Sequence, residues 1–204
     1  MEGVRRCKTP SLIWVAIVSA LVAPLVSGCS LEPQNGYVES ADGSLSFRYP
    51  AQWHDVEIAP VKTEWVVAVD AADQPAKEHL AAFVVDDPFV VAQVYGLTTA
   101  DRDIASLRSL RKMALTDGRD PTDAGDPTIR LLFHDAYLDD NGFEGHHLRF
   151  EVDLPNGTAV EEQFAAYDLD RKQIHRVRVA CSLSCFEANS GAIEELFDSV
   201  RLSP

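Results

Sequence analysis

Histidine side chains in the second half of the chain are the first candidates for acid–base or metal chemistry. His146 and His147 are adjacent in a segment of alternating apolar and polar residues, which predicts a strand. Adjacent strand residues point to opposite faces of a sheet, so these two imidazoles cannot bind one metal ion together. His146 and His175 could both face the apolar side, on strands separated by a third. We interpret them as histidines at the rim of a core, and we expect no metal site and no cofactor.

Charged and amide side chains occupy the polar positions of the same predicted strands. They are Arg149, Glu151, Asp153, Glu161, Gln163, Arg176 and Arg178. Together they could form a carboxylate-rich face suited to general acid–base catalysis. Their signs are interspersed, however, and this favours a ladder of opposite charges in which each pair contributes roughly a few tenths of a kcal/mol. The sequence also lacks the standard catalytic and phosphate-binding motifs, so we expect no enzymatic activity.

Four aspartates recur at every third position of a loop-like stretch rich in glycine and proline. They are Asp117, Asp120, Asp123 and Asp126. Calcium prefers oxygen ligands of this kind, but calcium-binding loops place them at alternate positions and end in a glutamate. Because this stretch has neither property, we interpret it as a solvated acidic loop.

The N-terminus has the composition of an export signal. Arg5, Arg6 and Lys8 precede an apolar run over residues 12–25, and small residues follow it. The run has about 14 residues, fewer than the roughly 20 that a membrane-spanning helix needs. We therefore predict a signal peptide rather than a transmembrane anchor.

Val26-Ser27-Gly28-Cys29 closes this segment and resembles the lipobox of bacterial lipoprotein signals. The resemblance implies that residues 1–28 are removed and that Cys29 is linked to diacylglycerol as the new N-terminus. Two or more acyl chains hold a protein stably at a membrane. We expect residues 29–41 to form a lipidated tether and residues 42–204 a single domain, anchored at the extracytoplasmic face of the cell membrane.

Cys181 and Cys185 are the two cysteines of the predicted domain, since Cys7 lies in the signal and Cys29 is the lipid site. In an exported chain an even pair of this kind indicates a disulfide. A redox pair usually has two intervening residues rather than three, and a zinc site needs four ligands. We therefore predict a structural Cys181–Cys185 bridge.

Composition limits the partners of the chain. Its 204 residues have a net charge of −14, and the predicted signal contributes positive charge, so the remainder is more acidic still. Such a surface repels nucleic acid and anionic lipid headgroups, and we expect no nucleic-acid partner. Because 46% of the residues are hydrophobic, the chain can nevertheless bury a core.

The elements that must position these residues are clearest after residue 128. Alternating segments at 128–138, 143–154, 158–168 and 173–181 predict four strands. Asn141-Gly142 and Asn156-Gly157 separate the first three, and Asn-Gly favours a type I′ hairpin turn. The sequence therefore predicts an antiparallel meander.

Before and after this meander the pattern predicts further strands and two helices. The additional strands are expected at 45–50, 65–69, 82–85 and 89–97. Helices are expected over 99–117 and 190–202, where apolar residues recur every three or four positions. The fold class that follows is α+β, with an antiparallel sheet packed by these helices.

Two stretches carry a resemblance to known families. Phe47-Arg48-Tyr49-Pro50-Ala51-Gln52-Trp53 is similar to the opening segment of PsbP-like domains. Val179-Ala180-Cys181-Ser182-Leu183-Ser184-Cys185-Phe186, with the helix after it, resembles the end of actinobacterial lipoproteins of the LpqN type. The resemblance implies an α-β-α sandwich around a central antiparallel sheet, in a fold used mainly for binding and assembly.

These inferences lead to one principal functional hypothesis. We expect a membrane-anchored binding or assembly module of the cell envelope, with a lipid, a glycan or a protein as ligand. Trp53, Trp65 and Tyr95 are the aromatic residues that could line its apolar pocket. The alternatives are an envelope hydrolase with a carboxylate or histidine site outside the known motifs, and a purely structural envelope protein.

Overall fold

The computed structural model describes residues 35–56, 58, 64–71, 86–113, 128–155 and 157–204. The signal segment, Cys29, the expected strand at 82–85 and the acidic loop at 117–126 lie outside these residues. No helix in the described part of the chain is long and apolar enough to cross a membrane.

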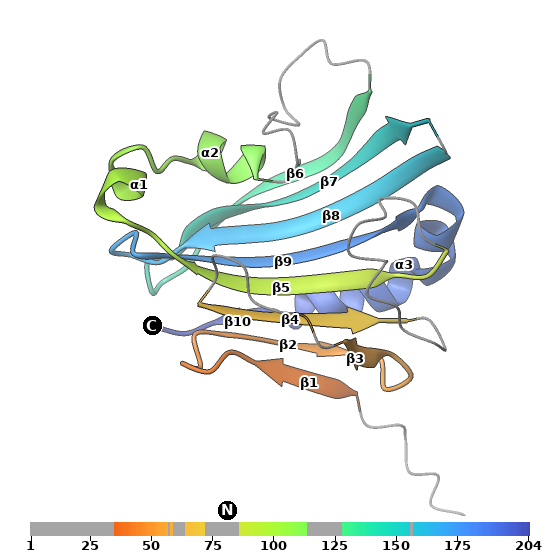
Figure 1. Cartoon of the computed structure of the whole chain (residues 1–204), viewed down its shortest axis with the longest axis horizontal. Helices are drawn as coiled ribbons and strands as arrows, with labels where there is room; N and C mark the ends of the chain where they lie inside the picture. Colours follow the sequence, from red (N-terminus) through yellow and green to blue (C-terminus); the bar gives the residue numbers. More distant parts are fainter. Residues whose placement is uncertain (1–34, 57, 59–63, 72–85, 114–127, 156) are drawn as a thin grey trace, which may run out of the picture. The chain divides into compact units, whose positions relative to one another are not determined.

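A seven-stranded antiparallel sheet forms the centre of the domain (Figure 1). Its strands, in spatial order, are β3 (His54–Val56), β4 (Trp65–Asp70), β5 (Phe89–Gly96), β9 (Gln173–Ser182), β8 (Gly157–Tyr167), β7 (Glu144–Leu154) and β6 (Ile129–Leu138). The predicted meander is thus confirmed as β6 to β9, each strand paired with the next along the chain. The alternating pattern and the short connections explain why these strands are the most predictable part of the chain.

The turn between β6 and β7 differs from the type I′ turn expected at Asn141-Gly142. Gly142 has a positive φ of 85°, whereas Asn141 does not share the left-handed conformation that type I′ requires. The Asp139 carboxylate explains the difference, because it accepts hydrogen bonds from the backbone N–H groups of Asn141 (3.0 Å) and Phe143 (2.9 Å). An aspartate at the start of a turn can select its geometry in this way.

A second, three-stranded sheet has the order β1-β2-β10, from β1 (Gly36–Glu39), β2 (Leu45–Tyr49) and β10 (Arg201–Leu202). Its β1 occupies residues that the sequence suggested were tether. The chain is therefore folded from Gly36 onward rather than from residue 42. Gly36 is required at this position, because a Cβ atom there would lie 2.2 Å from the Tyr49 ring.

Helix α3 (Leu183–Asp198) begins earlier than the predicted start at residue 190 and ends before residue 202. Ser182 caps it, with its side chain accepting from the backbone N–H of Cys185, so the helix follows β9 directly. Its buried side chains Ile193, Leu196 and Phe197 confirm the apolar face that the sequence predicted. Residues 201–202 instead extend as β10.

The single helix expected over 99–117 is replaced by two short ones, α1 (Thr99–Asp103) and α2 (Leu107–Lys112). Ser106 is extended, with φ −155° and ψ 161°, and its side chain caps α2 by accepting from the backbone N–H of Ser109. A serine in the middle of a helical pattern can therefore end one helix and start the next. Residues 114–117 lie outside the described part.

The two faces of the large sheet are packed by different elements. On one face lies the main core, which includes Val90, Val177 and Val179 from the sheet, Ile193 and Leu196 from α3, and Leu45 and Phe47 from β2. On the other face Leu110 of α2 packs against Ala165, Tyr167 and Ile174. The α+β class with helices on either side of an antiparallel sheet is thus confirmed, with the small sheet sharing the layer of α3.

Candidate ligand-binding groove

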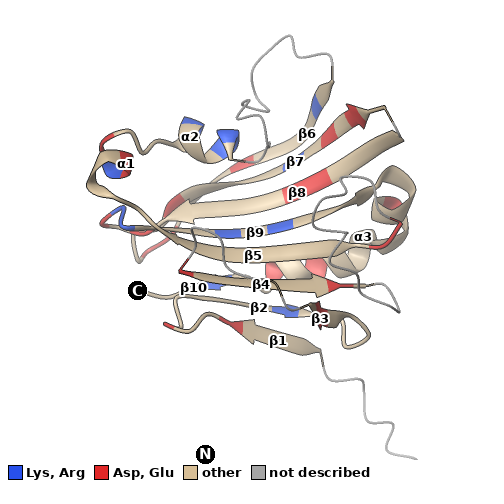
Figure 2. Ribbon diagram, viewed as in Figure 1, with Lys and Arg blue, Asp and Glu red and all other residues tan. Residues whose placement is uncertain are grey.

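The charged strand positions do not form one face. Strand register places Arg176 opposite Ala165, and Ala165 opposite His146, so these residues share a face. Alternation along the strands puts the polar residues on two faces: Glu161, Gln163, Arg176 and Arg178 on the face of His146, and Arg149, Glu151 and Asp153 on the face of His147. The carboxylate-rich single active face is therefore not formed. Opposite charges pair across neighbouring strands at Arg130–Glu151 and Arg149–Glu162, and Figure 2 shows an acidic segment on β8 and a basic one on β9.

Glu162 is the centre of a buried ion network beneath α3. Its carboxylate lies 2.7 Å from His147 Nε2 and accepts from Arg149 Nε at 2.8 Å. The Arg149 guanidinium lies over the Phe186 ring, and the His147 ring lies against Phe197. Both partners are held by packing as well as by charge, so the network joins β7 and β8 to α3, with the Arg149 and His147 side chains partly exposed.

Glu161, the residue before Glu162 in β8, faces the opposite side of the sheet and has no hydrogen-bonded cation there within the described residues. Its side chain is only 3% exposed, and its closest cation is Arg178, whose Nη1 lies 3.8 Å from Oε2. Burial raises the pKa of Glu161, against the opposing influence of Arg178 and Arg176. Within the described residues neither carboxylate oxygen has a hydrogen bond, so its burial is destabilising.

His146 and His175 lie on opposite faces of the sheet, contrary to the expectation that both face the apolar side. His146 is opposite Ala165, whereas His175 is opposite Ala166, the next residue of β8. Among the described residues no group of three histidine, cysteine or acidic side chains could hold a metal ion.

Trp53, Trp65 and Tyr95, the expected pocket aromatics, are not brought together. Trp53 is 4% exposed and belongs to the main core. Trp65 packs against the same core, while Tyr95 lies on the opposite face of the sheet beside the α1–α2 cluster. Burial of Trp53 makes it a packing residue, and a pocket shared by the three is not formed.

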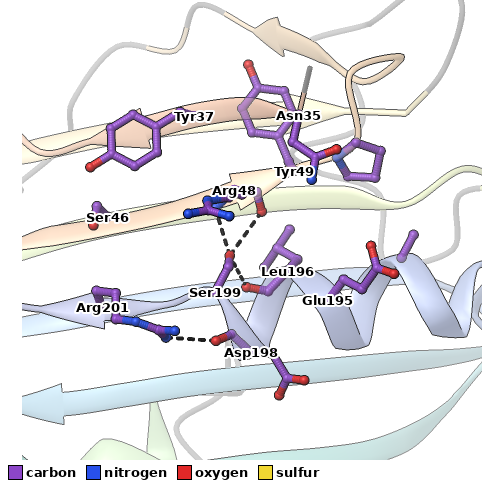
Figure 3. Close-up of a pocket in the computed structure, with 12 residues that line it drawn as sticks. Asn35, Tyr37, Ser46, Arg48, Tyr49, Glu195, Leu196, Asp198, Ser199 and Arg201 are labelled. Atoms are coloured by element: carbon purple, nitrogen blue, oxygen red, sulfur yellow. Dashed lines mark hydrogen bonds between the residues drawn. The ribbon is translucent and has the colours of Figure 1, made fainter. Parts of the chain in front are cut away.

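A groove of about 490 Å³ lies elsewhere, along the seam between α3 and the small sheet (Figure 3). Side chains of both elements line it: Asn35, Tyr37, Ser46, Arg48, Tyr49, Pro50, Ala192, Glu195, Leu196, Asp198, Ser199 and Arg201. Its volume is within the range of about 300–1,000 Å³ typical of small-molecule sites.

The alternation of the small sheet explains which side chains reach this groove. Tyr37 pairs with Arg48 across β1 and β2, and Ser46 pairs with Arg201 across β2 and β10. Because alternate residues Leu45 and Phe47 are buried in the core, the residues between them face outward. Two arginines and a tyrosine are therefore presented together on one exposed surface.

Ser199 fixes α3 against β2 at the base of the groove. Its Oγ accepts from the backbone N–H of Arg48 at 2.8 Å and donates to the Leu196 carbonyl at 2.7 Å. Arg201 Nη1 donates to the carbonyls of Asp198 and Val200, both at 2.7 Å, and so caps the end of the helix. The bond between Ser199 and Arg48 joins residues 151 positions apart in sequence and holds the two walls of the groove together.

Tyr49 closes one end of the groove as a neutral phenol. Burial and its contact with Asp55 raise the pKa of Tyr49 to about 12. Its hydroxyl donates to Asp55 Oδ1 at 2.8 Å, which fixes the ring over Gly36. The ring therefore offers an apolar surface with a fixed position, suited to contact with a ligand.

A second hollow, of about 370 Å³, contains the one serine–histidine contact among the described residues. His175 Nε2 lies 3.0 Å from Ser44 Oγ, and Ser44 Oγ donates to Asp42 Oδ1 at 2.6 Å. Burial lowers the pKa of His175, against the opposing charges of Asp168 and Asp42, so the imidazole is neutral. Burial also disfavours the charge of Asp42, but hydrogen bonds from Ser40 and Ser44 outweigh it and hold the pKa of that carboxyl well below its usual range.

This arrangement differs from a catalytic triad in one decisive contact. In a triad the carboxylate orients the histidine, whereas Asp42 binds the serine instead. Asp42 Oδ1 also accepts from the Ser44 backbone N–H at 3.0 Å, which is the bonding of a turn between β1 and β2. We interpret Ser44 as a residue of the β1–β2 turn whose hydroxyl is also in hydrogen-bond contact with His175.

Cys181 and Cys185 are placed with their sulfur atoms at disulfide distance, 2.17 Å, across the junction of β9 and α3. Both are buried, and the pair joins the end of a central strand to the first turn of the helix. A loop of this size removes roughly 2 kcal/mol of unfolded-state entropy.

We expect the Cys181→Ala/Cys185→Ala variant to fold with a free energy of unfolding lower by roughly 2 kcal/mol. Urea unfolding of both proteins measures the difference, and intact-mass analysis with alkylation checks the bridge. Wild-type protein with two alkylated thiols, or an unchanged midpoint in the variant, would contradict the structural role.

Comparison with known proteins supports the fold and leaves the activity open. No protein-family model and no curated protein matches the chain. Among solved structures it is similar to the PsbP protein of the cyanobacterium Synechocystis, with a TM-score of 0.52 and 13% identity over 89% of this chain and 100% of that one. It is also similar to LpqN of Mycobacterium tuberculosis, which is described as involved in cell envelope biogenesis. The TM-score is 0.53 and the identity 12%, over 84% of this chain and 91% of LpqN. For the Ran-binding protein Mog1p of Saccharomyces cerevisiae the TM-score is 0.50 and the identity 9%, over 84% of this chain and 96% of Mog1p.

The chain therefore has a PsbP-like fold. Identities of this size show a common fold and nothing about the ligand, so the likeness to LpqN is one of structure. The groove residues of β1 and β10 were not identified from the sequence, although Phe47-Arg48-Tyr49 of β2, in the segment that suggested this fold, contributes two other lining residues.

Proposed function

We infer that this protein is a lipid-anchored, extracytoplasmic binding module of the cell envelope, and that its ligand occupies the groove between α3 and the small sheet. The observation that carries this inference is the groove itself. It has preformed walls, two tyrosine rings and an arginine, Arg48, whose guanidinium has no hydrogen bond or ion pair within the described residues. A ligand would supply the missing partner.

The N-terminal sequence supports this location. The lipobox-like Val26-Ser27-Gly28-Cys29 supports acylation at Cys29. Only a few residues separate Cys29 from β1, which begins at Gly36. Such a tether keeps the domain close to the membrane surface.

The comparisons support a binding role by analogy of fold. One structural neighbour is described as a Ran-binding protein and another as involved in cell envelope biogenesis. Neither description names an enzymatic reaction. Fold analogy is a weak argument for function, so the groove remains the principal support.

We expect protein purified gently from its own membrane to carry a ligand in native mass spectrometry. The Tyr37→Ala/Arg48→Ala variant should lose that ligand and keep its fold, because both side chains are exposed. Arg102→Gln, an exposed arginine on α1, is the matched control and should retain it. Cys29→Ala should remain an unprocessed and unlipidated precursor.

Three results would count against the proposal. A groove variant that retains the full ligand load would exclude this groove as the site. A Cys29→Ala protein that is still cleaved and acylated would exclude the anchor. Absence of any ligand or partner in the native protein would favour the purely structural alternative.

A hydrolase is the second candidate, because His175 and Ser44 are within hydrogen-bond distance in a hollow. If they formed a nucleophile and base, turnover of an ester would disappear in both Ser44→Ala and His175→Gln. The turn role of Ser44 predicts no turnover in the parent protein against esters, glycosides, peptides and phosphates.

A further inference from the structure

The groove contains opposite charges that do not neutralise one another. Arg48 and Arg201 come from the small sheet, and Glu195 and Asp198 from the last turns of α3. No ion pair joins any of these cations to either carboxylate within the described part of the chain. The groove is therefore neutral in total but has separate cationic and anionic regions.

The two regions lie toward different ends of the groove (Figure 3). Arg48 and Arg201 lie toward one end and Glu195 lies toward the other, while Asp198 lies next to Arg201. The C-terminal carbonyls of α3 lie at the Arg201 end of the groove, where they partly offset the charge of that arginine. Because Arg201 Nη1 already binds the helix end, Arg48 is the cation with the most free hydrogen-bond donors.

Separate regions of this kind fit a ligand that is itself a zwitterion. A purely anionic ligand would be attracted by Arg48 but repelled by Glu195 and Asp198. A purely cationic ligand would be attracted by the two carboxylates but repelled by Arg48. The net charge of −14 of the chain also disfavours anions at long range, whereas a neutral zwitterion is not repelled.

The position of the groove along the chain indicates where this zwitterion comes from. Asn35, which lines the groove, is six residues after Cys29. At about 3.6 Å per residue, a fully extended connection spans at most roughly 22 Å. If Cys29 is acylated, as in the proposed function, the groove is therefore held within reach of lipid headgroups.

We propose that the groove binds the zwitterionic phosphate–ammonium headgroup of a membrane phospholipid of the ethanolamine type. The phosphate lies at Arg48, which offers a planar set of donors suited to phosphate oxygens. The ammonium lies at Glu195. This inference deepens the proposed function and depends on it for the membrane location.

The experiment uses the full, lipidated protein in non-ionic detergent and three soluble probes. These are glycerophosphoethanolamine, which has both charges, glycerol 3-phosphate, which has the anion, and ethanolamine, which has the cation. In isothermal titration calorimetry, glycerophosphoethanolamine should bind at least tenfold more tightly than glycerol 3-phosphate or ethanolamine. It is the probe that carries a charge for each of the two regions. Short-chain phosphatidylethanolamine should bind at least as tightly as the soluble headgroup, which distinguishes a membrane lipid from a free metabolite.

Two variants assign the regions separately. Arg48→Gln should lower the affinity for glycerophosphoethanolamine and for glycerol 3-phosphate by about tenfold each. Glu195→Gln should lower the affinity for glycerophosphoethanolamine to a similar degree. The affinity for glycerol 3-phosphate should stay unchanged or rise, because the substitution removes a negative charge that repels the phosphate. Glu187→Gln, an exposed glutamate on the same helix, is the matched control and should change neither.

Equal affinity for glycerophosphoethanolamine and glycerol 3-phosphate would reduce the site to an anion site and overturn the proposal. Equal effects of Glu187→Gln and Glu195→Gln would do the same. Intact-mass analysis of the same preparation separates the two levels of inference. If Cys29 carries its acyl chains and no headgroup binds, the headgroup inference fails while the anchored binding module stands; an unmodified Cys29 removes the anchor itself.

Discussion

Replacing Glu162 with alanine should lower the free energy of unfolding by about 1.5–3 kcal/mol, the range for losing hydrogen bonds to a charged group. Glu162 is 1% exposed and is the common acceptor of His147 and Arg149. Its removal leaves the Arg149 guanidinium without its anion beneath Phe186. Because the network joins β7 and β8 to α3, the loss affects the whole sheet-to-helix interface. Urea unfolding followed by circular dichroism measures the effect.

Asp170→Ala is the matched control, since Asp170 forms an exposed ion pair with Lys172 in the β8–β9 turn. Exposed pairs contribute between about 0 and 1 kcal/mol, so its midpoint should change little. If the two variants lost equal stability, the burial of Glu162 would have no energetic consequence. A Glu162→Ala protein as stable as the parent would mean that Arg149 and His147 find other partners.

The contrast between Glu161 and Glu162 explains one limit of sequence-based prediction. Both are acidic residues in the same strand, and the alternating pattern indicates only that they face opposite sides. It does not indicate that both sides are covered, which depends on how α3 and the α1–α2 region pack on the sheet. The sequence therefore suggested one solvated polar face, where the structure has two buried sets of charges.

The meander was predictable because its information is local. From residue 128 onward the strands alternate and are joined by short turns, so each strand pairs with its neighbour in sequence. Helix boundaries were less predictable, because they depend on single capping residues. Ser106 and Ser182 each accept a backbone N–H and so begin a helix at a place that the apolar period does not mark.

The groove depended on contacts that are distant in sequence. β10 has two residues and β1 has four, too few for a pattern to be recognised. Their pairing with β2 brings Arg201 beside Ser46 and allows Ser199 to bind Arg48. The signal that could have indicated the site was the exposed Tyr37 opposite Arg48, but only if residues 36–39 were first recognised as a strand.

The aromatic residues illustrate the opposite error, in which packing residues are mistaken for ligand contacts. Trp53, Trp65 and Tyr95 have the side chains that binding pockets favour, and the same side chains fill cores. Trp53 follows the turn after β2, where its backbone N–H donates to the Pro50 carbonyl at 2.9 Å. That turn directs the indole into the core, where it is 4% exposed.

Trp53→Ala should consequently lower the free energy of unfolding by about 3–5 kcal/mol, the usual cost of truncating a buried aromatic side chain to alanine. The sequence suggested Trp53 as a pocket residue, whose loss would remove ligand and leave the fold intact, and the burial of Trp53 reverses this expectation. Tyr37→Ala is the control, because Tyr37 is 58% exposed in the groove and its loss should change stability by less than about 0.5 kcal/mol. Trp53→Phe should retain much of the stability, since it leaves a smaller cavity.

Thermal and urea unfolding, with native mass spectrometry of the same samples, distinguish the two residues. We expect Trp53→Ala to unfold at a much lower midpoint but to carry ligand while folded, because Trp53 does not line the groove. The groove variant Tyr37→Ala/Arg48→Ala should show the reverse, an unchanged midpoint and no ligand. A Trp53→Ala protein with the parental midpoint and no ligand would instead return Trp53 to the binding site, and with it the pocket of aromatic residues that the sequence suggested.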